Sequence, residues 1–365
     1  MTEKKTLATV QYLARLLSLL ENGGEVPALP EDVTLADVYA LSHRHSLGAA
    51  AYLALSSVIR DSDTPDEYKK KWARELELAT VQHIKHTAAF AEITQAFTEA
   101  KLRFLPIKGF LFKKMWKHPE LRTMADMDIV VSAEDHPRAG EILLSLGYAL
   151  DHGGEVHDSY IKGQFVNVEL HRMLYDGATE SFEDWTPRED NPYWYEMTLD
   201  DSLLFNLRHA FKHYEHGGCG LRSIFDFHLF FKNYGRRDDN DALVDRMKDA
   251  GLYEFYQTVC LLVDTWFLDA RVDEAEEAAL YIASGGVYGT LDNGVSYSIK
   301  KRGSKTKHFL WRLFPPFKIM AGRYKWVKKC PILLPIAYVV RLITAIFNGR
   351  ARREMQSIQT HKSDD

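Results

Sequence analysis

Two aspartates, Asp126 and Asp128, stand one residue apart at the start of a short apolar segment, residues 127–131. Side chains of a strand alternate between its faces, so both aspartates project to one side and the apolar side chains to the other. Two ionised carboxylates this close repel each other unless a cation lies between them. Because Mg²⁺ prefers oxygen ligands, we expect the pair to hold Mg²⁺, with Mn²⁺ as an alternative. The commoner role of an isolated D-x-D is to flank a strand in solvent, so the neighbouring residues decide.

A Lys-Gly turn precedes the aspartates. Residues 103–107 have the composition of a short buried strand, and the apolar spacing of residues 109–117 predicts a helix that begins at Gly109. A glycine there lets a phosphate approach the backbone, and the first-turn N–H groups favour anions. Lys108 adds a mobile positive charge and Arg122 a second one. A Lys-Gly pair between a strand and a helix often only makes the turn.

A third acid follows in QFVNVELHR, residues 164–172. Polar and apolar side chains alternate there, so Glu169 and His171 fall on the polar face of a predicted strand. Glu169 could complete a metal site or act as the base for an incoming hydroxyl. Its alternative role is that of an edge-strand residue facing water.

Residues 104–172 resemble the nucleotidyltransferase superfamily, whose members are DNA polymerase beta-like, and more closely a family of uncharacterised bacterial nucleotidyltransferases. The resemblance implies that Asp126, Asp128 and Glu169 are catalytic and bind metal, and that the nucleotide is bound by Lys108, Gly109 and Arg122. It implies transfer of a nucleoside monophosphate from an NTP to the hydroxyl of a sugar, metabolite, protein or RNA, with release of pyrophosphate.

Two features depart from the superfamily pattern. Phe110 follows Gly109 where the superfamily has Gly or Ser, and 16 residues, 110–125, separate the glycine from Asp126. The contacts to the triphosphate are therefore expected to differ from the superfamily pattern.

The pattern of helix and strand signals predicts an α+β fold, a small mixed-sheet nucleotidyltransferase core with helical N-terminal and C-terminal regions. Further predicted elements are strands near 127–131, 156–161 and 165–171 and a helix over 133–146. The predicted units are an N-terminal helical region (1–101), the α+β core (102–196), a helical domain that contributes to the cleft (197–299) and a basic, aromatic-rich amphipathic region (300–365).

The first hundred residues carry helix signals throughout. Thr34 and Asp37 form a predicted capping box, and Thr64-Pro65-Asp66-Glu67 starts a helix that runs to about Lys101. Charged and polar residues interrupt the N-terminus, which favours an amphipathic helix over a signal peptide. Three cysteines in 365 residues argue against a disulfide framework or a cysteine metal cluster. We expect a cytoplasmic protein.

The predicted helix 203–214 places His209, His213 and His216 on one face. They predict either a polar face toward the cleft or, less commonly, a transition-metal site and a metallohydrolase. Arg222 and Asp226 lie one helical turn apart and are expected to pair. The family resemblance implies a substrate pocket that includes His171, His213, Arg222 and Asp226.

Charge is segregated toward the C-terminus. Residues 300–353 contain 15 Lys or Arg and no Asp or Glu, so the rest of the chain carries −20 against a whole-chain charge of −5. Aromatic residues alternate with these cations, as suits an anionic membrane surface or nucleic acid. The alternative is that this region packs on the protein's own acidic body. A second functional hypothesis is therefore a catalytically silent peripheral membrane or scaffold protein that acts through this basic region. Under this hypothesis the protein associates with a membrane surface and binds no nucleotide.

Overall fold

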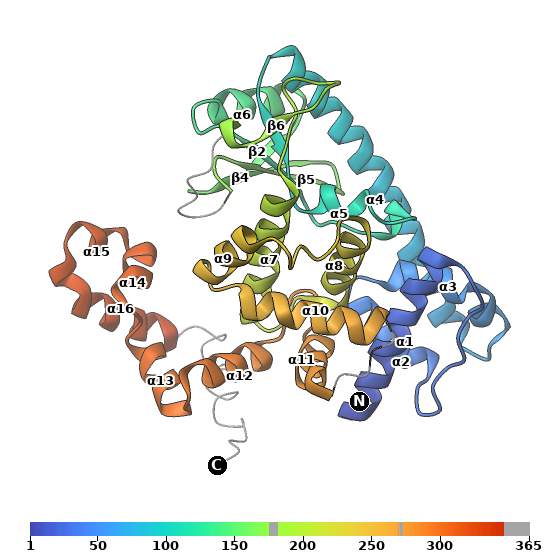
Figure 1. The fold of residues 1–365 in the computed structure, drawn as a ribbon. Coiled ribbons are helices and arrows are strands. Elements are labelled where there is room, and N and C mark those ends of the chain that lie inside the picture. Colours follow the sequence, from blue (N-terminus) through green and yellow to red (C-terminus); the bar gives the residue numbers. More distant parts are fainter. Residues whose placement is uncertain (175–181, 269, 271–272, 347–365) are drawn as a thin grey trace.

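A five-stranded mixed sheet, flanked by helices, forms the upper part of the molecule in Figure 1. The computed structural model describes residues 1–174, 182–268, 270 and 273–346. The predicted α+β class is confirmed. The strand order is β1 (Phe104–Pro106), β2 (Met127–Val131), β5 (Val166–His171), β4 (His157–Lys162) and β3 (Ala149–Gly153).

The central pair, β2 and β5, runs parallel, and the other neighbours are antiparallel. The predicted strands are confirmed to within about two residues at each end, the usual uncertainty of such boundaries. The sequence analysis missed β3. Its five residues are all exposed, so no alternation of polar and apolar residues marks it. It also missed the small pair β6 (Thr186–Pro187) and β7 (Tyr195–Glu196).

The two faces of the sheet have different neighbours. One face is apolar and packs against the long helix α4 (Asp66–Glu99) and against α6 (His136–Ser145), with Met127, Ile129, Val168 and Leu170 fully buried beside Phe97. Asp128 and Glu169 alternate with these residues and therefore point to the opposite face. The alternation predicted for both strands is confirmed.

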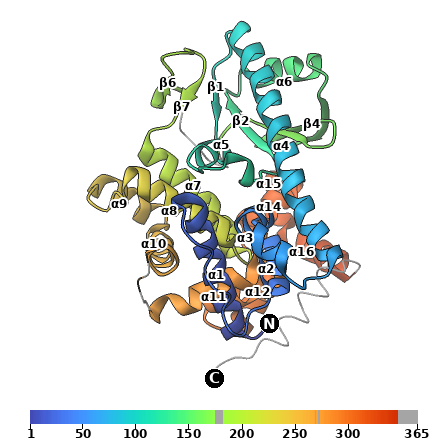
Figure 2. The ribbon, with the colours of Figure 1, turned by 90° about the vertical axis from the view of Figure 1, so that its right-hand side faces the viewer.

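The N-terminal helices and those that follow the sheet share one hydrophobic core. Helix α1 (Glu3–Asn22) lies against α8, α10 and α11 (Figure 2). The predicted capping box holds, since Thr34 and Asp37 exchange hydrogen bonds at the start of α2. The helices of this core are α1, α2 (Leu35–Arg44), α3 (Gly48–Asp61), α7 (Leu199–Glu215), α8 (Gly220–Tyr234), α9 (Asp241–Asp249), α10 (Tyr253–Phe267) and α11 (Glu276–Gly285), and α4 adds Trp72 and Ala79. Phe112, on the short helix over residues 109–113, also belongs to it. The predicted domain boundaries remain predictions.

The helix predicted over 109–117 is shorter than expected. Helix α5 ends at Lys113 (Gly109–Lys113), and the following turn directs the indole of Trp116 into the helical core. The Nε1–H of Trp116 donates to Asp226 Oδ1 at 2.8 Å. The apolar spacing of this segment therefore reflects burial of a turn as well as a helix.

A buried ion pair joins the sheet-containing part to the helical core. Arg122 donates from Nε and Nη2 to the two carboxylate oxygens of Asp226, at 2.9 and 2.8 Å. The expected pairing of Arg222 with Asp226 is wrong, because Arg122 occupies both oxygens, and Arg222 Nη1 donates instead to the carbonyl of Thr123 at 2.8 Å. Both ends of the Arg122–Asp226 pair are almost fully buried.

Beyond the shared core, the chain continues into short helices at the left of Figure 1. They are α12 (Leu291–Arg302), α13 (Lys305–Leu313), α14 (Phe317–Arg323), α15 (Lys325–Lys329) and α16 (Leu334–Ile346). Residues 347–365 of the predicted basic region lie outside the described residues. Across the described part of the chain, no helix combines the length and apolar character that crossing a bilayer requires.

Replacing Asp226 by Asn should strongly destabilise the protein, because Arg122 would then be a buried charge without a counter-ion. We expect a loss of about 3–5 kcal/mol in the free energy of unfolding, measured by urea denaturation. The exposed Asp249→Asn, on the neighbouring α9, should change it by less than about 0.5 kcal/mol. A midpoint for Asp226→Asn equal to that of wild type would contradict this role.

Candidate active site

Three carboxylates, Asp126, Asp128 and Glu169, meet on the polar face of the sheet, and we call them the carboxylate cluster. Asp128 and Glu169 are direct neighbours in the parallel register of β2 and β5. Asp126 immediately precedes β2. Asp128 is buried, and the other two are half-buried. Because β5 is an inner strand, Glu169 is not the edge-strand residue that we considered as an alternative.

Two positively charged side chains hold this cluster together. Lys108 Nζ forms a short contact with Asp128 Oδ1 and lies 3.9 Å from Glu169 Oε2. His171 Nε2 lies 2.9 Å from Asp128 Oδ1 and 3.4 Å from Glu169 Oε2. Negative charge on the two strands is therefore shared between an ammonium and an imidazole.

The pKa directions follow from this arrangement. Burial, followed by the charges of Asp128 and Glu169, raises the pKa of Asp126 to about 6. The hydrogen bond with His171 lowers the pKa of Glu169 well below its usual range. Burial opposes the charges on Lys108 and His171, but the nearby carboxylates outweigh it and raise the pKa of both. Asp126 is thus the carboxylate whose negative charge is least compensated.

Lys108 adopts an unusual backbone conformation. Its φ is 55° and its ψ is −109°, a region that a residue with a side chain rarely occupies. Such outliers cost of order 1–3 kcal/mol and concentrate at functional sites. The turn directs the Lys108 side chain to Asp128, while the N–H of Ile107 donates to the Asp128 carbonyl at 3.1 Å.

Gly109 has a packing role that the sequence analysis did not anticipate. A Cβ at this position would lie 2.2 Å from Met124 Sδ and 3.1 Å from Arg122 Nη1. A side chain at this position would therefore displace Met124, whose side chain packs against the start of α5. Because α5 has only five residues, its dipole can contribute little to anion binding.

Arg122 was predicted to bind the nucleotide, but its side chain is engaged elsewhere in the fold. Its guanidinium is buried against Asp226, as described above, and lies over the ring of Phe112 at 5.6 Å. Asp226, expected in a substrate pocket, is likewise engaged with Arg122 and Trp116. Their predicted binding roles therefore form no part of the function proposed below.

Helix α7 brings two of its three predicted histidines toward the cluster. His209 and His213 have ring centroids 4.7 Å apart. Burial lowers the pKa of both, with Lys108 contributing, and that of His209 falls to about 3. His216 is exposed at the end of α7, where its Nδ1 lies 2.6 Å from the carbonyl of Lys212. The three histidines do not converge, so the metallohydrolase hypothesis has no geometric support.

His157 was missed by the sequence analysis. It is paired across β4 and β5 with His171, and their ring centroids lie 4.8 Å apart. Its Nε2 lies 3.7 Å from Glu169 Oε1. His157, Glu169 and His171 place potential ligand atoms within 4.8 Å of one another. The sequence indicated only that His157 lies near the start of a predicted strand, and the strand beside it could not be known from the sequence.

Arg222 lies half-buried close to the cluster. Its Nε is buried and has no hydrogen-bond partner in the described structure. Burial lowers the pKa of its guanidinium to about 10. The charge of Arg122 lowers this pKa further, and the charge of Asp126 opposes the decrease. Arg222 therefore keeps unused hydrogen-bonding capacity, unlike Arg122.

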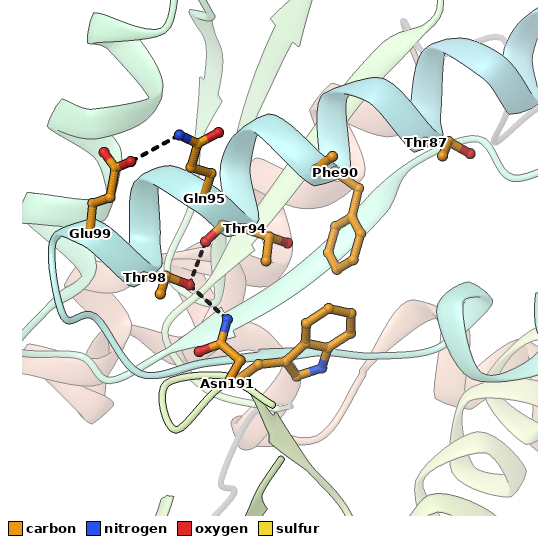
Figure 3. Close-up of a pocket in the computed structure, with 9 residues that line it drawn as sticks. Thr87, Phe90, Thr94, Gln95, Thr98, Glu99 and Asn191 are labelled. Atoms are coloured by element: carbon orange, nitrogen blue, oxygen red, sulfur yellow. Dashed lines mark hydrogen bonds between the residues drawn. The ribbon is translucent and has the colours of Figure 1, made fainter. Parts of the chain in front are cut away.

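A pocket of about 640 Å³ lies elsewhere, along α4 (Figure 3). Phe90 and Trp194 meet there edge to face, and Asn191 donates to the hydroxyl of Thr98 at 2.7 Å. None of its lining residues belongs to the carboxylate cluster. This pocket is therefore separate from the carboxylate cluster.

Comparisons with known proteins place the chain in a family. Residues 31–268, more than half of the chain, match the sequence model of a family described as uncharacterised nucleotidyltransferase. No curated protein matches the chain. A solution structure of the antibiotic-resistance factor ANT(2'')-Ia is similar at 12% identity and a TM-score of 0.37, covering 48% of this chain and 98% of that one.

Asp126→Asn should stabilise the protein in the absence of divalent cations. The raised pKa means that the folded state disfavours the ionised carboxyl, so wild type loses stability as the pH rises from about 3.8 to about 6. We expect the variant to gain about 1–2 kcal/mol at pH 8, and the gain to shrink as the pH falls toward 4. Urea denaturation with a chelator present measures it.

Asp151→Asn, an exposed carboxylate on β3, serves as the control and should show no such pH-dependent gain. Equal stability of wild type and Asp126→Asn at pH 8 would show that neither burial nor the neighbouring carboxylates disfavour the ionised form of Asp126.

Proposed function

The chain belongs to the uncharacterised nucleotidyltransferase family, and on that premise we propose that it moves a nucleoside monophosphate from an NTP to an acceptor hydroxyl, releasing pyrophosphate. The observation that carries the proposal is the carboxylate cluster, in which two adjacent strands present Asp128 and Glu169 beside Asp126. The acceptor is a hydroxyl-bearing sugar, metabolite, protein or RNA.

The donor set of the cluster fits a divalent cation. Three carboxylates supply hard oxygen ligands, and Asp126 retains charge that Lys108 and His171 do not neutralise. We assign Mg²⁺ to Asp126, Asp128 and Glu169. When bound, the ion would neutralise charge on the phosphate and lower the pKa of the attacking hydroxyl. The same three carboxylates would also suit Mn²⁺, which prefers oxygen ligands as Mg²⁺ does.

Lys108 has two roles in this proposal. In the protein without ligands, its ammonium neutralises Asp128. With the carboxylates engaged by a cation, the ammonium becomes available to the phosphate oxygens of the nucleotide. Arg222, with its unpartnered Nε, is the second phosphate-binding cation that we assign.

A base is needed to take the proton of the acceptor hydroxyl. The lowered pKa of Glu169 suits a metal ligand and disfavours the role of base that we had considered. His157 is half-exposed, and burial lowers its pKa, so it is neutral at pH 7. We assign it to accept the hydroxyl proton while the hydroxyl oxygen attacks the α-phosphate. We also assign the neutral His209 and His213 of α7, which lie near Lys108, to contact the substrate.

Nucleotide binding should require both the cluster and a divalent cation. Calorimetric titration of ATP, GTP, CTP and UTP into wild type should reveal one preferred nucleotide, bound only with Mg²⁺. The double variant Asp126→Asn/Asp128→Asn should lose this binding, and Asp128→Asn alone should abolish transfer, because the cation ligands are gone. Asp151→Asn should behave as wild type. No binding of any nucleotide by folded wild type would favour the catalytically silent protein instead.

Lys108→Met should change two affinities in opposite directions. Without nucleotide, Mn²⁺ should bind more tightly, because the ammonium no longer competes for Asp128. NTP affinity should fall by about 10–100-fold, because a charge-assisted phosphate contact is lost. Electron paramagnetic resonance of free Mn²⁺ measures the first and calorimetry the second.

Lys70→Met, a substitution of an exposed lysine on α4, is the matched control and should change neither affinity. If Lys108→Met weakened both Mn²⁺ and nucleotide binding, its effect would be structural and the two-role assignment would fail.

A further inference from the structure

Helix α16 and the turn before it expose a continuous apolar surface. Its residues are Ile332, Ile336, Val339, Val340 and Ile343, with exposed fractions of 86%, 55%, 55%, 37% and 53%. Their spacing of three and four places them on one side of the helix. We call these five residues the apolar stripe. Isolated exposed apolar residues are ordinary, but a contiguous set is not.

The opposite side of α16 is already occupied. Ala337 is fully buried in a small core with Met320 and Val327. The hydroxyl of Tyr338 donates to the carbonyl of Pro315 at 2.9 Å, and Arg341 Nη1 donates to the carbonyl of Arg312 at 2.5 Å. These contacts set the rotation of α16, so the apolar stripe faces outward because of the fold of residues 305–346, which we call the C-terminal helical module.

The module adds further exposed apolar side chains and exposed cations. Five other large apolar residues on α13–α15 and their connections are at least 36% exposed: Leu310, Phe314, Phe317, Ile319 and Trp326. Lys318, Arg323, Lys328 and Lys329 are exposed on the same helices. No Asp or Glu occurs between residues 293 and 353. The C-terminal helical module therefore exposes apolar side chains and cations without acidic residues among them, and a partner that covers it must accept both.

The alternative that the basic region packs on the protein's acidic body accounts for only some of these cations. Lys300 pairs with Glu277 at 2.6 Å and Lys301 with Glu215 at 2.5 Å, both before the module begins. Within the module, Lys325 contacts Glu155, the loop residue two positions before β4, at 2.7 Å. The apolar stripe has no part in these pairs.

We propose that the C-terminal helical module docks on an anionic phospholipid bilayer, with the apolar stripe in the interface and the exposed lysines against the lipid phosphates. Interfacial helices combine an apolar face with cations in this way. Nucleic acid would satisfy the cations but leave the stripe in water. A second copy would bring two surfaces of like charge together. The proposal does not depend on nucleotidyl transfer.

Flotation of the full chain with vesicles tests the proposal. Wild type should float with phosphatidylcholine vesicles that contain about 30% phosphatidylglycerol and should float poorly with phosphatidylcholine alone. Ile336→Asn/Val340→Asn should lower the bound fraction at least about tenfold, because the stripe then carries polar groups. Lys328→Gln/Lys329→Gln should lower it by about fivefold or more, since each cation near an anionic surface contributes.

Matched substitutions outside the module are the controls. Ile84→Asn replaces an apolar residue that is 62% exposed on α4, and Lys70→Gln/Lys71→Gln removes two exposed lysines of the same helix. Both should float as wild type does. Circular dichroism and thermal unfolding establish that each variant is folded.

Four outcomes would overturn the proposal. They are failure of folded wild type to float on anionic vesicles, equal flotation on neutral vesicles, flotation unchanged by the stripe substitutions, and loss of flotation in the controls. If the stripe substitutions instead dissociated a dimer or abolished nucleic-acid binding, the surface would belong to that partner. None of these outcomes bears on nucleotide binding, which the calorimetric titrations measure separately. A failure of the membrane proposal would therefore not contradict the proposed nucleotidyl transfer.

Discussion

Mutual repulsion among three carboxylates is the physical constraint that organises the candidate active site of this molecule. Parallel pairing of β2 with β5 brings Asp128 beside Glu169. Asp126 projects to the same side as Asp128 because side chains two residues apart along an extended chain share one face. Without counter-charges, such a cluster would oppose folding. Lys108 and His171 provide them, and the strained backbone of Lys108 shows how strongly the surroundings favour that contact.

Lys108 and His171 compensate only part of the negative charge of the carboxylate cluster. Asp128 and Glu169 each have a cationic neighbour, whereas Asp126 has a raised pKa because its charge is opposed by burial and by both other acids. If Lys108 and His171 neutralised all the negative charge of the cluster, the site would have little affinity for a cation. If none of that charge were neutralised, repulsion among the carboxylates would oppose folding. In the function that we propose, the same residues therefore balance stability against binding, and Lys108 moves from a carboxylate to a phosphate.

Sequence reasoning succeeded where period and residue type carry the information. Strands β2 and β5, the outward direction of Asp128 and Glu169, and the start of α4 all follow from local patterns. What it missed depends on contacts between distant segments. The pairing of His157 with His171 requires the strand order, and the partner of Asp226 lies 104 residues away, on a turn rather than on the same helix. Strand β3 had no buried face, so no periodicity could mark it.

Arg122 shows how architecture and chemistry are linked through one such distant contact. Its ion pair with Asp226 anchors the chain between α5 and β2 to the helical core, and its Nη1 and Met124 together leave no space for a side chain at Gly109. The tight turn at Gly109 in turn sets the backbone of Lys108, which reaches Asp128. A residue that resembles a phosphate ligand in the sequence thus acts, in the fold, by holding in place the lysine that we assign to the phosphate.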